Sequence, residues 1–236
     1  MPLAPEKVPR HVAIIMDGNR RFARHLMLKP WMGHEWGAKK FQQVLDWCRE
    51  LGVRELTVYA FSIQNFGRPK EEFDYLMNLF RKEYGSFKDD PRIYEHKIRI
   101  NFLGRLGMFP DDIRAMMRDL MERTQAHDRY VINFAMAYGG REEVVDAAVR
   151  LAREIKEGTL DAEQINEAVF ERHLYTRSAP DLVIRTGGDH RTSNFLIWQA
   201  NYAEWIFLDK TWPEFEKEDF EQCLADYADR ERRFGK

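Results

Sequence analysis

The sequence predicts an α/β fold in which helices flank a mainly parallel central sheet. Three observations lead to this fold class. Six short apolar segments rich in β-forming residues lie along the chain, segments with helical spacing of apolar residues separate most of them, and no internal repeat or Pro/Gly/Ser-rich linker interrupts the series. Strands that alternate with helices are typical of a parallel sheet. We expect residues 1–236 to form a single domain with a substantial buried core.

Each predicted element rests on a local pattern. The first strand is a short apolar run that ends abruptly at Asp17, and the first helix shows Phe41, Val44 and Cys48 at helical spacing. Pro110 suits the first turn of another helix. We predict strands at His11–Asp17, Glu55–Ser62, Ile98–Leu103, Tyr130–Tyr138, Asp181–Arg185 and Glu204–Leu208, and helices at Gly37–Leu51, Lys70–Tyr84, Pro110–Gln125 and Arg141–Lys156.

Composition excludes several classes of protein. The net charge of −2 lacks the basic excess of a nucleic-acid binder, and the longest apolar runs are far too short to span a bilayer. No secretory signal is visible at the N-terminus. Cys48 and Cys223 stand alone without C-x-x-C spacing, which fits buried thiols in a reducing cytoplasm better than a disulfide. We therefore expect a cytoplasmic protein that binds no nucleic acid.

Unusual polar residues gather where the predicted strands end. In open parallel sheets, ligands bind outside the carboxyl ends of the strands. Four segments follow strands and hold most of the unusual polar chemistry of the chain: residues 17–21, 62–68, 138–141 and 185–193. Their coincidence at one edge of the predicted sheet is the first indication of a site.

Asp17 ends the first predicted strand and is followed by Gly18 and by Asn19, Arg20 and Arg21, which open a short helix. One interpretation is a Mg²⁺ site, because this ion prefers one or two carboxylates together with phosphate oxygens, which arginines also bind. The other is an aspartate that caps a helix beside surface arginines. The segment lacks the spacing of a nucleotide P-loop.

The segment after the fifth predicted strand gives a stronger indication of an anion site. Within residues 185–194, two glycines form a turn that can aim N–H groups at an anion, while Arg185, Arg191 and Ser193 supply charge and donors. A solvated loop is the alternative. Glu204 begins the next strand and is either a second carboxylate for a metal or an ordinary exposed glutamate.

Other candidate residues are open to plainer interpretations. His34 could assist phosphate binding, but a lone histidine is more often structural, and no zinc motif or G-x-S-x-G elbow is present. Apolar residues at helical spacing belong to the core by default, unless a substrate with a long hydrocarbon tail requires a tunnel. These residues are Leu76, Met77, Phe80, Met116, Met117 and Leu120.

Three long motifs resemble the signatures of the cis-prenyltransferase family. Residues 11–24 (HVAIIMDGNRRFAR) resemble the opening motif, residues 59–69 (YAFSIQNFGRP) the second motif, and residues 185–204 (RTGGDHRTSNFLIWQANYAE) the C-terminal motif. They occur in the expected order and cover nearly the whole chain. The resemblance implies a Mg²⁺-dependent enzyme that lengthens an allylic prenyl diphosphate with isopentenyl diphosphate, in a fold with a hydrophobic tunnel.

The resemblance also implies roles for individual residues. Asp17 would bind Mg²⁺ and assist departure of the allylic diphosphate, and Asn19 and Asn65 would act in catalysis. Glu204 would contribute to the metal site of the isopentenyl diphosphate. Arg233 and Gly235 match an R-x-G element that reaches the site of a neighbouring subunit, which implies a homodimer. The residues implied in substrate binding are Gly18, Arg20, Arg21, His34, Ser62, Arg68, Arg185, Arg191, Ser193, Arg233 and Gly235.

The chain departs from the family pattern mainly on the allylic side. Arg20 stands in place of a Gly common in bacterial members, Pro30 in place of a phosphate-binding Arg, and Gln64 and Asp189 in place of Glu. This pattern is closer to the archaeal and eukaryotic branch. Two alternatives to chain elongation stay open: a transferase of the same fold with another acceptor or regiochemistry, and a non-catalytic partner subunit. A membrane-peripheral location through the lipid product is compatible with either enzyme.

Overall fold

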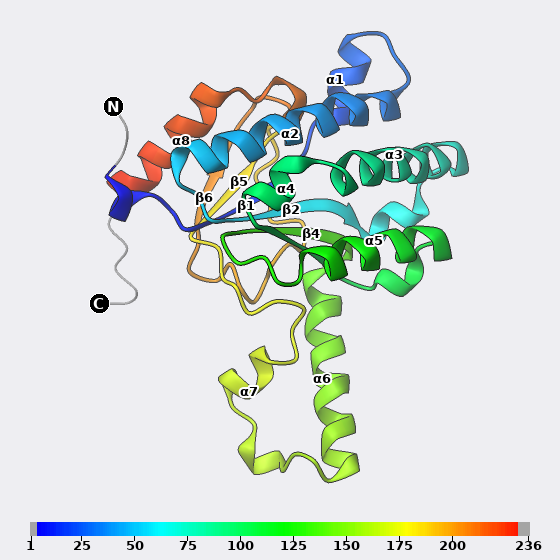
Figure 1. Ribbon diagram of the computed structural model, residues 1–236, viewed down its shortest axis with the longest axis vertical. Coiled ribbons are helices and arrows are strands. Elements are labelled where there is room, and N and C mark those ends of the chain that lie inside the picture. Colours follow the sequence, from blue (N-terminus) through cyan, green and yellow to red (C-terminus); the bar gives the residue numbers. More distant parts are fainter. Residues whose placement is uncertain (1–3, 231–236) are drawn as a thin grey trace.

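The computed structural model describes residues 4–230, and its centre is a six-stranded sheet (Figure 1). All strand pairs are parallel, and the strand order is β3-β4-β2-β1-β5-β6. The prediction of a mainly parallel sheet is thus confirmed. The strands are β1 (His11–Ile15), β2 (Glu55–Ser62), β3 (Ile98–Leu103), β4 (Tyr130–Tyr138), β5 (Leu182–Arg185) and β6 (Glu204–Phe207).

Eight α-helices accompany the sheet in the described part of the chain, three more than the sequence patterns predicted. The short helix expected to open at Asn19 is present as α1, and the four longer predicted helices are present too, although α3 runs on to Lys88 and α2 begins four residues early, at Gly33. The three unpredicted helices are α4 and α7, which have five residues each, and α8, which begins after a capping box at Glu216. The helices are α1 (Asn19–His25), α2 (Gly33–Leu51), α3 (Lys70–Lys88), α4 (Pro91–Glu95), α5 (Asp111–Thr124), α6 (Gly140–Glu157), α7 (Glu167–Glu171) and α8 (Lys217–Asp229).

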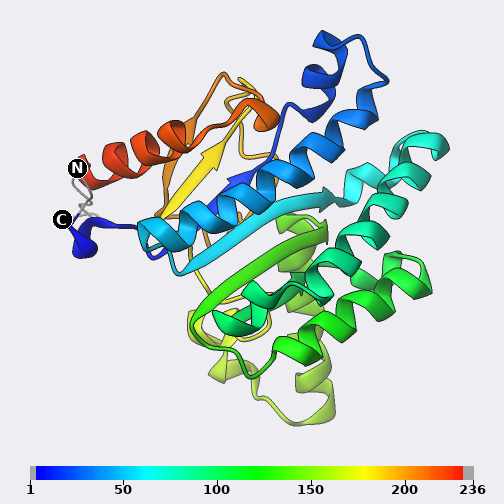
Figure 2. The ribbon, with the colours of Figure 1, turned by 45° about the horizontal axis from the view of Figure 1, so that its top comes forward.

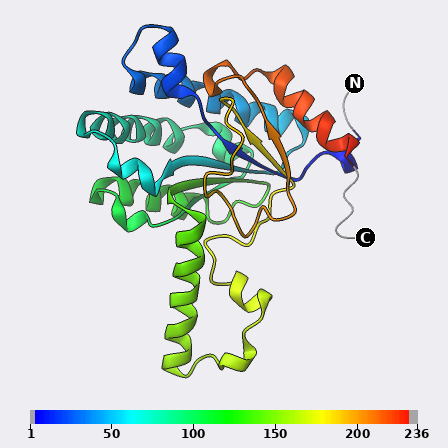
Figure 3. The ribbon, with the colours of Figure 1, turned by 180° about the vertical axis from the view of Figure 1, so that it is seen from behind.

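The two faces of the sheet are covered differently. Helices α2, α3, α5 and α8 lie over one face and bury a large apolar core that includes Phe41, Phe87 and Phe220 (Figure 2). On the other face, the segment between β5 and β6 packs through Phe195 and Leu196. Helix α6 begins on this side and projects away from the body together with α7 (Figure 3).

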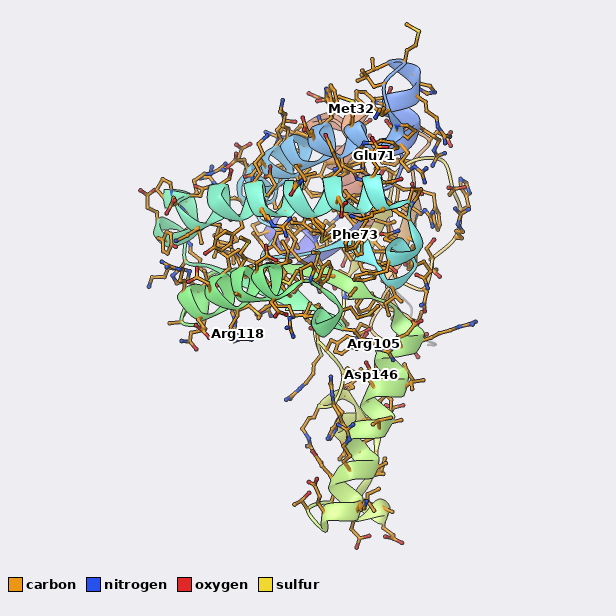
Figure 4. The ribbon with its side chains drawn as sticks, turned by 90° about the vertical axis from the view of Figure 1, so that its right-hand side faces the viewer. Met32, Glu71, Phe73, Arg105, Arg118 and Asp146 are labelled. Atoms are coloured by element: carbon orange, nitrogen blue, oxygen red, sulfur yellow. The ribbon has the colours of Figure 1, made fainter. Side chains whose placement is uncertain are left out.

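The base of α6 is fixed to the body by an ion pair. Arg105 lies next to the short 3₁₀ helix η4 (Leu106–Met108), which follows β3, and its guanidinium donates two hydrogen bonds to Asp146 of α6, at 2.9 and 2.8 Å (Figure 4). The Tyr175 hydroxyl also donates to Asp146. The exposed length of α6 therefore projects from a rigid base.

Strand order brings the two strongest sequence motifs together. β1 lies in the middle of the sheet, with β2 on one side and β5 on the other. Ile15 pairs with Arg185 in register, so Asp17 and the segment after Arg185 leave the same edge side by side. This is the crevice where parallel sheets bind ligands.

Two further expectations concern the whole chain. Cys48 and Cys223 are both buried and free, which confirms their interpretation as apolar core residues. Among residues 4–230, no helix has the length and apolar character needed to cross a bilayer.

Candidate active site

A cavity of about 400 Å³ begins at the C-terminal edge of the sheet and continues between the sheet and helices α2, α3 and α5. Its polar lining comes from the loops that follow the strands. Its apolar lining comes mostly from the helices and from strands β2, β3 and β4. The predicted site residues that line it are Asp17, Asn19, His34, Ser62, Asn65, Arg68, Arg185, Arg191 and Ser193.

Arg185 organises the first ion cluster, which we call the β1–β5 cluster (Asp17, Arg21, Arg185, Asp189 and Arg191). The Arg185 side chain is only 3% exposed, and its Nη2 donates to Asp17 Oδ2 at 2.8 Å. Its Nη1 donates to Ser193 Oγ at 2.7 Å and to the Arg191 carbonyl. A buried guanidinium thus holds Asp17 and Ser193 in fixed positions.

The other charges of the β1–β5 cluster are more exposed. Arg21 Nη2 lies 3.6 Å from Asp17 and 3.4 Å from Asp189, while Arg191 donates two hydrogen bonds to Asp189 at 2.8 and 3.0 Å. Partial burial acts to raise the pKa of Asp189, but Arg191, Arg21 and Arg185 lower it overall. Three arginines against two carboxylates leave the cluster with one net positive charge, which favours a diphosphate.

Glycines make the close packing of the β1–β5 cluster possible. Gly18 has a φ of +101°, and a Cβ there would lie 2.6 Å from the Cβ of Thr211, so the turn from β1 into α1 requires glycine. Gly187 similarly leaves room for Arg21. Our expectation that this glycine turn aims N–H groups at an anion is wrong, because the N–H groups of Gly187 and Gly188 donate to the carbonyls of Lys210 and Leu208.

A second ion cluster, the α2–α3 cluster, consists of Arg20, His34, Arg68 and Glu72. Glu72 is completely buried and accepts a hydrogen bond from Arg68 Nη1 at 2.8 Å, and its other oxygen lies 3.7 Å from Arg20 Nη2. Arg68 Nη1 also lies 3.2 Å from His34 Nε2. The neighbours Arg20 and Arg21 therefore serve different clusters at the same mouth.

The ionisation of His34 fits its contact with Arg68. Burial first, and then the positive charges of Arg68 and Arg20, lower the pKa of His34 to about 3. At neutral pH the ring is uncharged, so Nε2 can accept the hydrogen bond that Arg68 donates. An arriving diphosphate would offset these positive charges and favour protonation of the ring.

Asn19, Ser62 and Asn65, which were predicted in the site, have defined structural partners. Asn65 Oδ1 accepts from the Ser62 N–H at 3.0 Å, and the Ser62 side chain accepts from the Asn65 N–H, which together cap η3 (Ile63–Gly67). Asn19 Nδ2 donates to the Met16 carbonyl at 3.1 Å, whereas its buried Oδ1 has no partner among the described residues. Gly37 permits this approach, since a Cβ there would lie 2.3 Å from Asn19 Oδ1.

The apolar part of the cavity has the character of a tunnel for a hydrocarbon tail. Of the six apolar candidates, five line it, namely Leu76, Phe80, Met116, Met117 and Leu120, whereas Met77 lies in the core. Phe41, Phe87 and Phe134 also line the cavity and pack against one another with ring centroids 5.3 to 6.0 Å apart. The predicted hydrophobic tunnel is therefore present.

The structure does not bring Glu204 to the other site residues of its own chain. β5 and β6 are parallel, and Leu182 pairs with Glu204 while Arg185 pairs with Phe207, so Glu204 lies at the opposite edge of the sheet from Asp17. It accepts a hydrogen bond from Arg230 at 2.6 Å. A metal shared by Asp17 and Glu204 of one chain is thus excluded.

Other predictions concern residues away from the cavity. Arg233 and Gly235 lie outside the described residues. Pro30 begins η2 (Pro30–Met32) and Gln64 is exposed on η3, and neither lines the cavity. The segment 138–141 does not reach the ion clusters either. It supports the loop after β5, because the N–H groups of Gly140 and Arg141 donate to Asn194.

Sequence reasoning missed three residues of the site. Glu72 fixes Arg68, and the spacing of four residues at the start of a helix could have indicated the pair. Trp212 lines the cavity and donates from Nε1 to the Gly37 carbonyl at 2.9 Å. Tyr59 lines it too and stacks on Phe195 at 4.7 Å. The last two join segments far apart in the chain, which no local pattern reveals.

The described residues offer Mg²⁺ only a partial set of ligands. No group of three or more His, Cys, Asp or Glu side chains among residues 4–230 could hold a metal by itself. Asp17 nevertheless presents a carboxylate at the cavity mouth, one third exposed and next to the arginines. This arrangement fits a Mg²⁺ ion that one carboxylate, water and substrate phosphate oxygens hold together.

Comparison with known proteins identifies the family. Residues 15–235 match the Prenyltransf family model, whose description reads “Putative undecaprenyl diphosphate synthase”. The chain belongs to the cis-prenyltransferase family. It is 47% identical over 231 residues to the tritrans,polycis-undecaprenyl-diphosphate synthase (geranylgeranyl-diphosphate specific) of Thermococcus kodakarensis, a match that covers 97% of this chain and 88% of that protein. An isoprenyl transferase of Thermus thermophilus is 48% identical over 236 residues, with 97% and 89% covered.

Solved structures agree with this assignment. Lavandulyl diphosphate synthase from Lavandula x intermedia, in complex with dimethylallyl diphosphate, superposes with a TM-score of 0.92 at 34% identity and covers 98% of this chain and 100% of that one. A probable undecaprenyl diphosphate synthase from Campylobacter jejuni gives 0.80 at 29% identity, with 97% and 99% covered. This cis-prenyltransferase is therefore an enzyme that transfers alkyl groups other than methyl, as its motifs predicted.

Proposed function

We propose that this cis-prenyltransferase condenses isopentenyl diphosphate with an allylic prenyl diphosphate and releases a longer cis-prenyl diphosphate. One observation carries the proposal: two arginine clusters flank the mouth of a cavity whose interior is apolar. A prenyl diphosphate has the same division between a strongly anionic head and a hydrocarbon tail. The alternative non-catalytic subunit has no need of both clusters.

Each cluster would hold one diphosphate. The β1–β5 cluster, through Arg185, Arg191 and Ser193, grips isopentenyl diphosphate. The α2–α3 cluster, through Arg68 and His34, holds the allylic diphosphate with its tail directed into the apolar cavity. Arginines fixed by buried partners stabilise charge on a departing diphosphate without reorganising. The apolar walls exclude water from the allylic cation, which would otherwise be hydrolysed.

Asp17 lies between the two substrates in this arrangement and would hold the Mg²⁺ ion. When bound, the ion neutralises charge on the diphosphate that departs. Arg185 fixes the Asp17 carboxylate through a hydrogen bond of 2.8 Å. Asn19 and Asn65 line the cavity close by and would orient the reacting groups. Loss of a proton after condensation gives the cis alkene.

The donor and the assembly are part of the proposal. The archaeal relatives that share 43 to 47% identity with this chain are named as geranylgeranyl-diphosphate specific, which supports a long allylic donor here. We further infer one domain that works as a cytoplasmic homodimer, with Arg233 and Gly235 reaching the site of the partner subunit. Glu204 lies near Arg230, just before that segment, so any contact of Glu204 with a metal would also be in the partner's site.

The direct test is incubation of the protein and Mg²⁺ with radiolabelled isopentenyl diphosphate and a panel of allylic donors of increasing length, followed by chromatographic sizing. We expect a product longer than the donor, with a cis double bond. A branched product of the same length would favour the alternative regiochemistry, and no incorporation with any donor would contradict the proposal. The Arg233→Ala variant should incorporate isopentenyl diphosphate more slowly, and an unchanged rate would exclude the cross-subunit role.

A further inference from the structure

The connection between α1 and η2 exposes apolar side chains to solvent. Among its residues, Leu26 is 46% exposed and Met27 is 95% exposed. Single exposed apolar residues are common on protein surfaces and need no explanation. Here two adjacent ones lie in the connection that follows α1, which projects above α2 at the top of Figures 1 and 2. We call residues 24–29 the tip loop.

The backbone of the tip loop makes the choice of Met27 unusual. The Leu28 N–H donates to the Ala23 carbonyl and the Met27 N–H to the Arg24 carbonyl, both at 2.9 Å, which closes the C-terminus of α1. Met27 has a φ of +57°, in the left-handed region where helices ordinarily end on glycine. A large apolar side chain is therefore kept almost fully exposed at a strained backbone position.

The tip loop lies in a basic segment of the chain. Residues 18–34 contain four arginines and lysines and no aspartate or glutamate, in a chain with a net charge of −2. Arg24 and His25 are exposed, and Lys29 is 61% exposed while it pairs with Glu71 at the start of α3. Exposed apolar side chains within a basic segment suit the surface of an anionic bilayer, since apolar burial and charge attraction add there.

The tip loop is also next to the mouth of the cavity. It is bracketed by Asn19 and His34, which both line the cavity. Figure 4 places Met32 above Glu71 and Phe73 along one side of the molecule, where η2 and the start of α3 come together. A bilayer in contact with the tip loop would therefore lie against the mouth through which lipid substrates pass.

We propose that the tip loop is a membrane anchor that inserts Leu26 and Met27 into an anionic lipid bilayer, with Arg24 and Lys29 at the level of the headgroups. The anchor rests on the proposed function, because an enzyme whose substrate and product have hydrocarbon tails exchanges them with a bilayer. Binding to vesicles is measured without substrate, so its failure is distinguishable from failure of prenyl transfer.

The test is co-sedimentation with vesicles of phosphatidylcholine, with or without phosphatidylglycerol. The wild-type protein should bind the anionic vesicles and lose binding as salt rises. Leu26→Ser/Met27→Gly should weaken binding by about tenfold or more, because two inserted side chains are lost. Arg24→Gln should weaken it by about fivefold. The single variant Met27→Gly relieves backbone strain and keeps the fold, so its weaker binding to anionic vesicles would report the lost side chain alone.

A control variant removes exposed apolar side chains elsewhere. Ile155 lies near the C-terminal end of α6 and Ile165 directly follows η5 (Ala162–Gln164), and they are 38% and 40% exposed. Figure 3 shows this end of α6 projecting away from the body, on the side opposite α1. Ile155→Ser/Ile165→Ser should bind vesicles like the wild type. The anchor is wrong if the wild-type protein binds neither kind of vesicle, or if the Leu26→Ser/Met27→Gly variant binds as well as the wild type does.

Discussion

The two ion clusters at the cavity mouth differ in where their carboxylates lie. In the β1–β5 cluster, Asp17 and Asp189 are each one third exposed, and the arginine that joins them, Arg185, is buried. In the α2–α3 cluster the carboxylate is the buried partner, since Glu72 is fully buried and Arg68 reaches the cavity. An exposed carboxylate can exchange an arginine for a metal, whereas a buried one can only position its arginine. The β1–β5 cluster is thus suited to metal chemistry and the α2–α3 cluster to holding a diphosphate.

The largest effect should follow removal of the buried arginine of the β1–β5 cluster. Arg185→Ala frees both Asp17 and Ser193, so we expect isopentenyl incorporation to fall by about 10³-fold. Arg185→Lys keeps the charge but lacks the two-pronged geometry, and should recover only a small part of the rate. A variant with wild-type turnover would show that Arg185 is a structural residue.

The buried carboxylate of the α2–α3 cluster should matter first for stability. Glu72→Gln leaves Arg68 beside an uncharged partner, and the free energy of unfolding should fall by about 3 kcal/mol. The KM for the allylic donor should rise, while that for isopentenyl diphosphate stays the same.

The adjacent Glu71 provides the matched control for Glu72. It is 64% exposed and pairs with Lys29, so Glu71→Gln should change stability by less than about 0.5 kcal/mol. Chemical denaturation of the three proteins at neutral pH measures both effects. Equal losses in the two variants would contradict the distinction between a buried and an exposed carboxylate.

A further effect concerns the pH dependence of stability. Folded His34 stays uncharged down to a pH of about 3, because its pKa is lowered to that value, whereas in the unfolded chain it binds a proton at a pH of about 6.5. The unfolded state therefore binds more protons between these values. The contribution of His34 is complete above pH 6.5 and declines as the pH falls toward 3, by up to about 1.4 kcal/mol per pH unit.

The His34→Gln variant should accordingly show a shallower loss of stability on acidification. His11 keeps part of the slope, since its pKa is also lowered by burial. His25→Gln is the control, because His25 is exposed. Thermal unfolding between pH 4 and 7 compares the three proteins, and identical slopes for His34→Gln and the wild type would contradict the burial of an uncharged His34.

The comparison of the clusters also shows what the sequence could reveal. The strands were predicted well because each is a short apolar run that ends in polar residues, and Asp17 and Arg185 were found because each follows such a run. Glu72 was missed although the predicted helix already began at Lys70, because only the packing of α3 shows that this first-turn glutamate is buried. Glu204 was wrongly expected near Asp17. It begins a strand, and the start of a parallel strand lies at the end of the sheet away from the ligand site.

Residues that depend on long-range packing escaped prediction for another reason. Trp212 and Gly37 lie 175 positions apart, and their hydrogen bond exists only because η6 (Trp212–Glu214) folds back against α2. The short helices α4 and α7 likewise depend on their tertiary contacts, since helices of this length have little stability alone. Local patterns therefore predicted the strands and the end of the sheet where ligands bind, whereas the cavity depends on the packing of distant segments.

The central claim is that Asp17, and not Asp189, is the carboxylate that serves the metal. Steady-state incorporation of isopentenyl diphosphate over a Mg²⁺ titration, in Asp17→Asn and Asp189→Asn, tests it most directly. We predict a loss of about 10³-fold for Asp17→Asn that no Mg²⁺ concentration restores, and a loss within about tenfold for Asp189→Asn. Near-wild-type turnover of Asp17→Asn, or the larger loss in Asp189→Asn, would contradict the account.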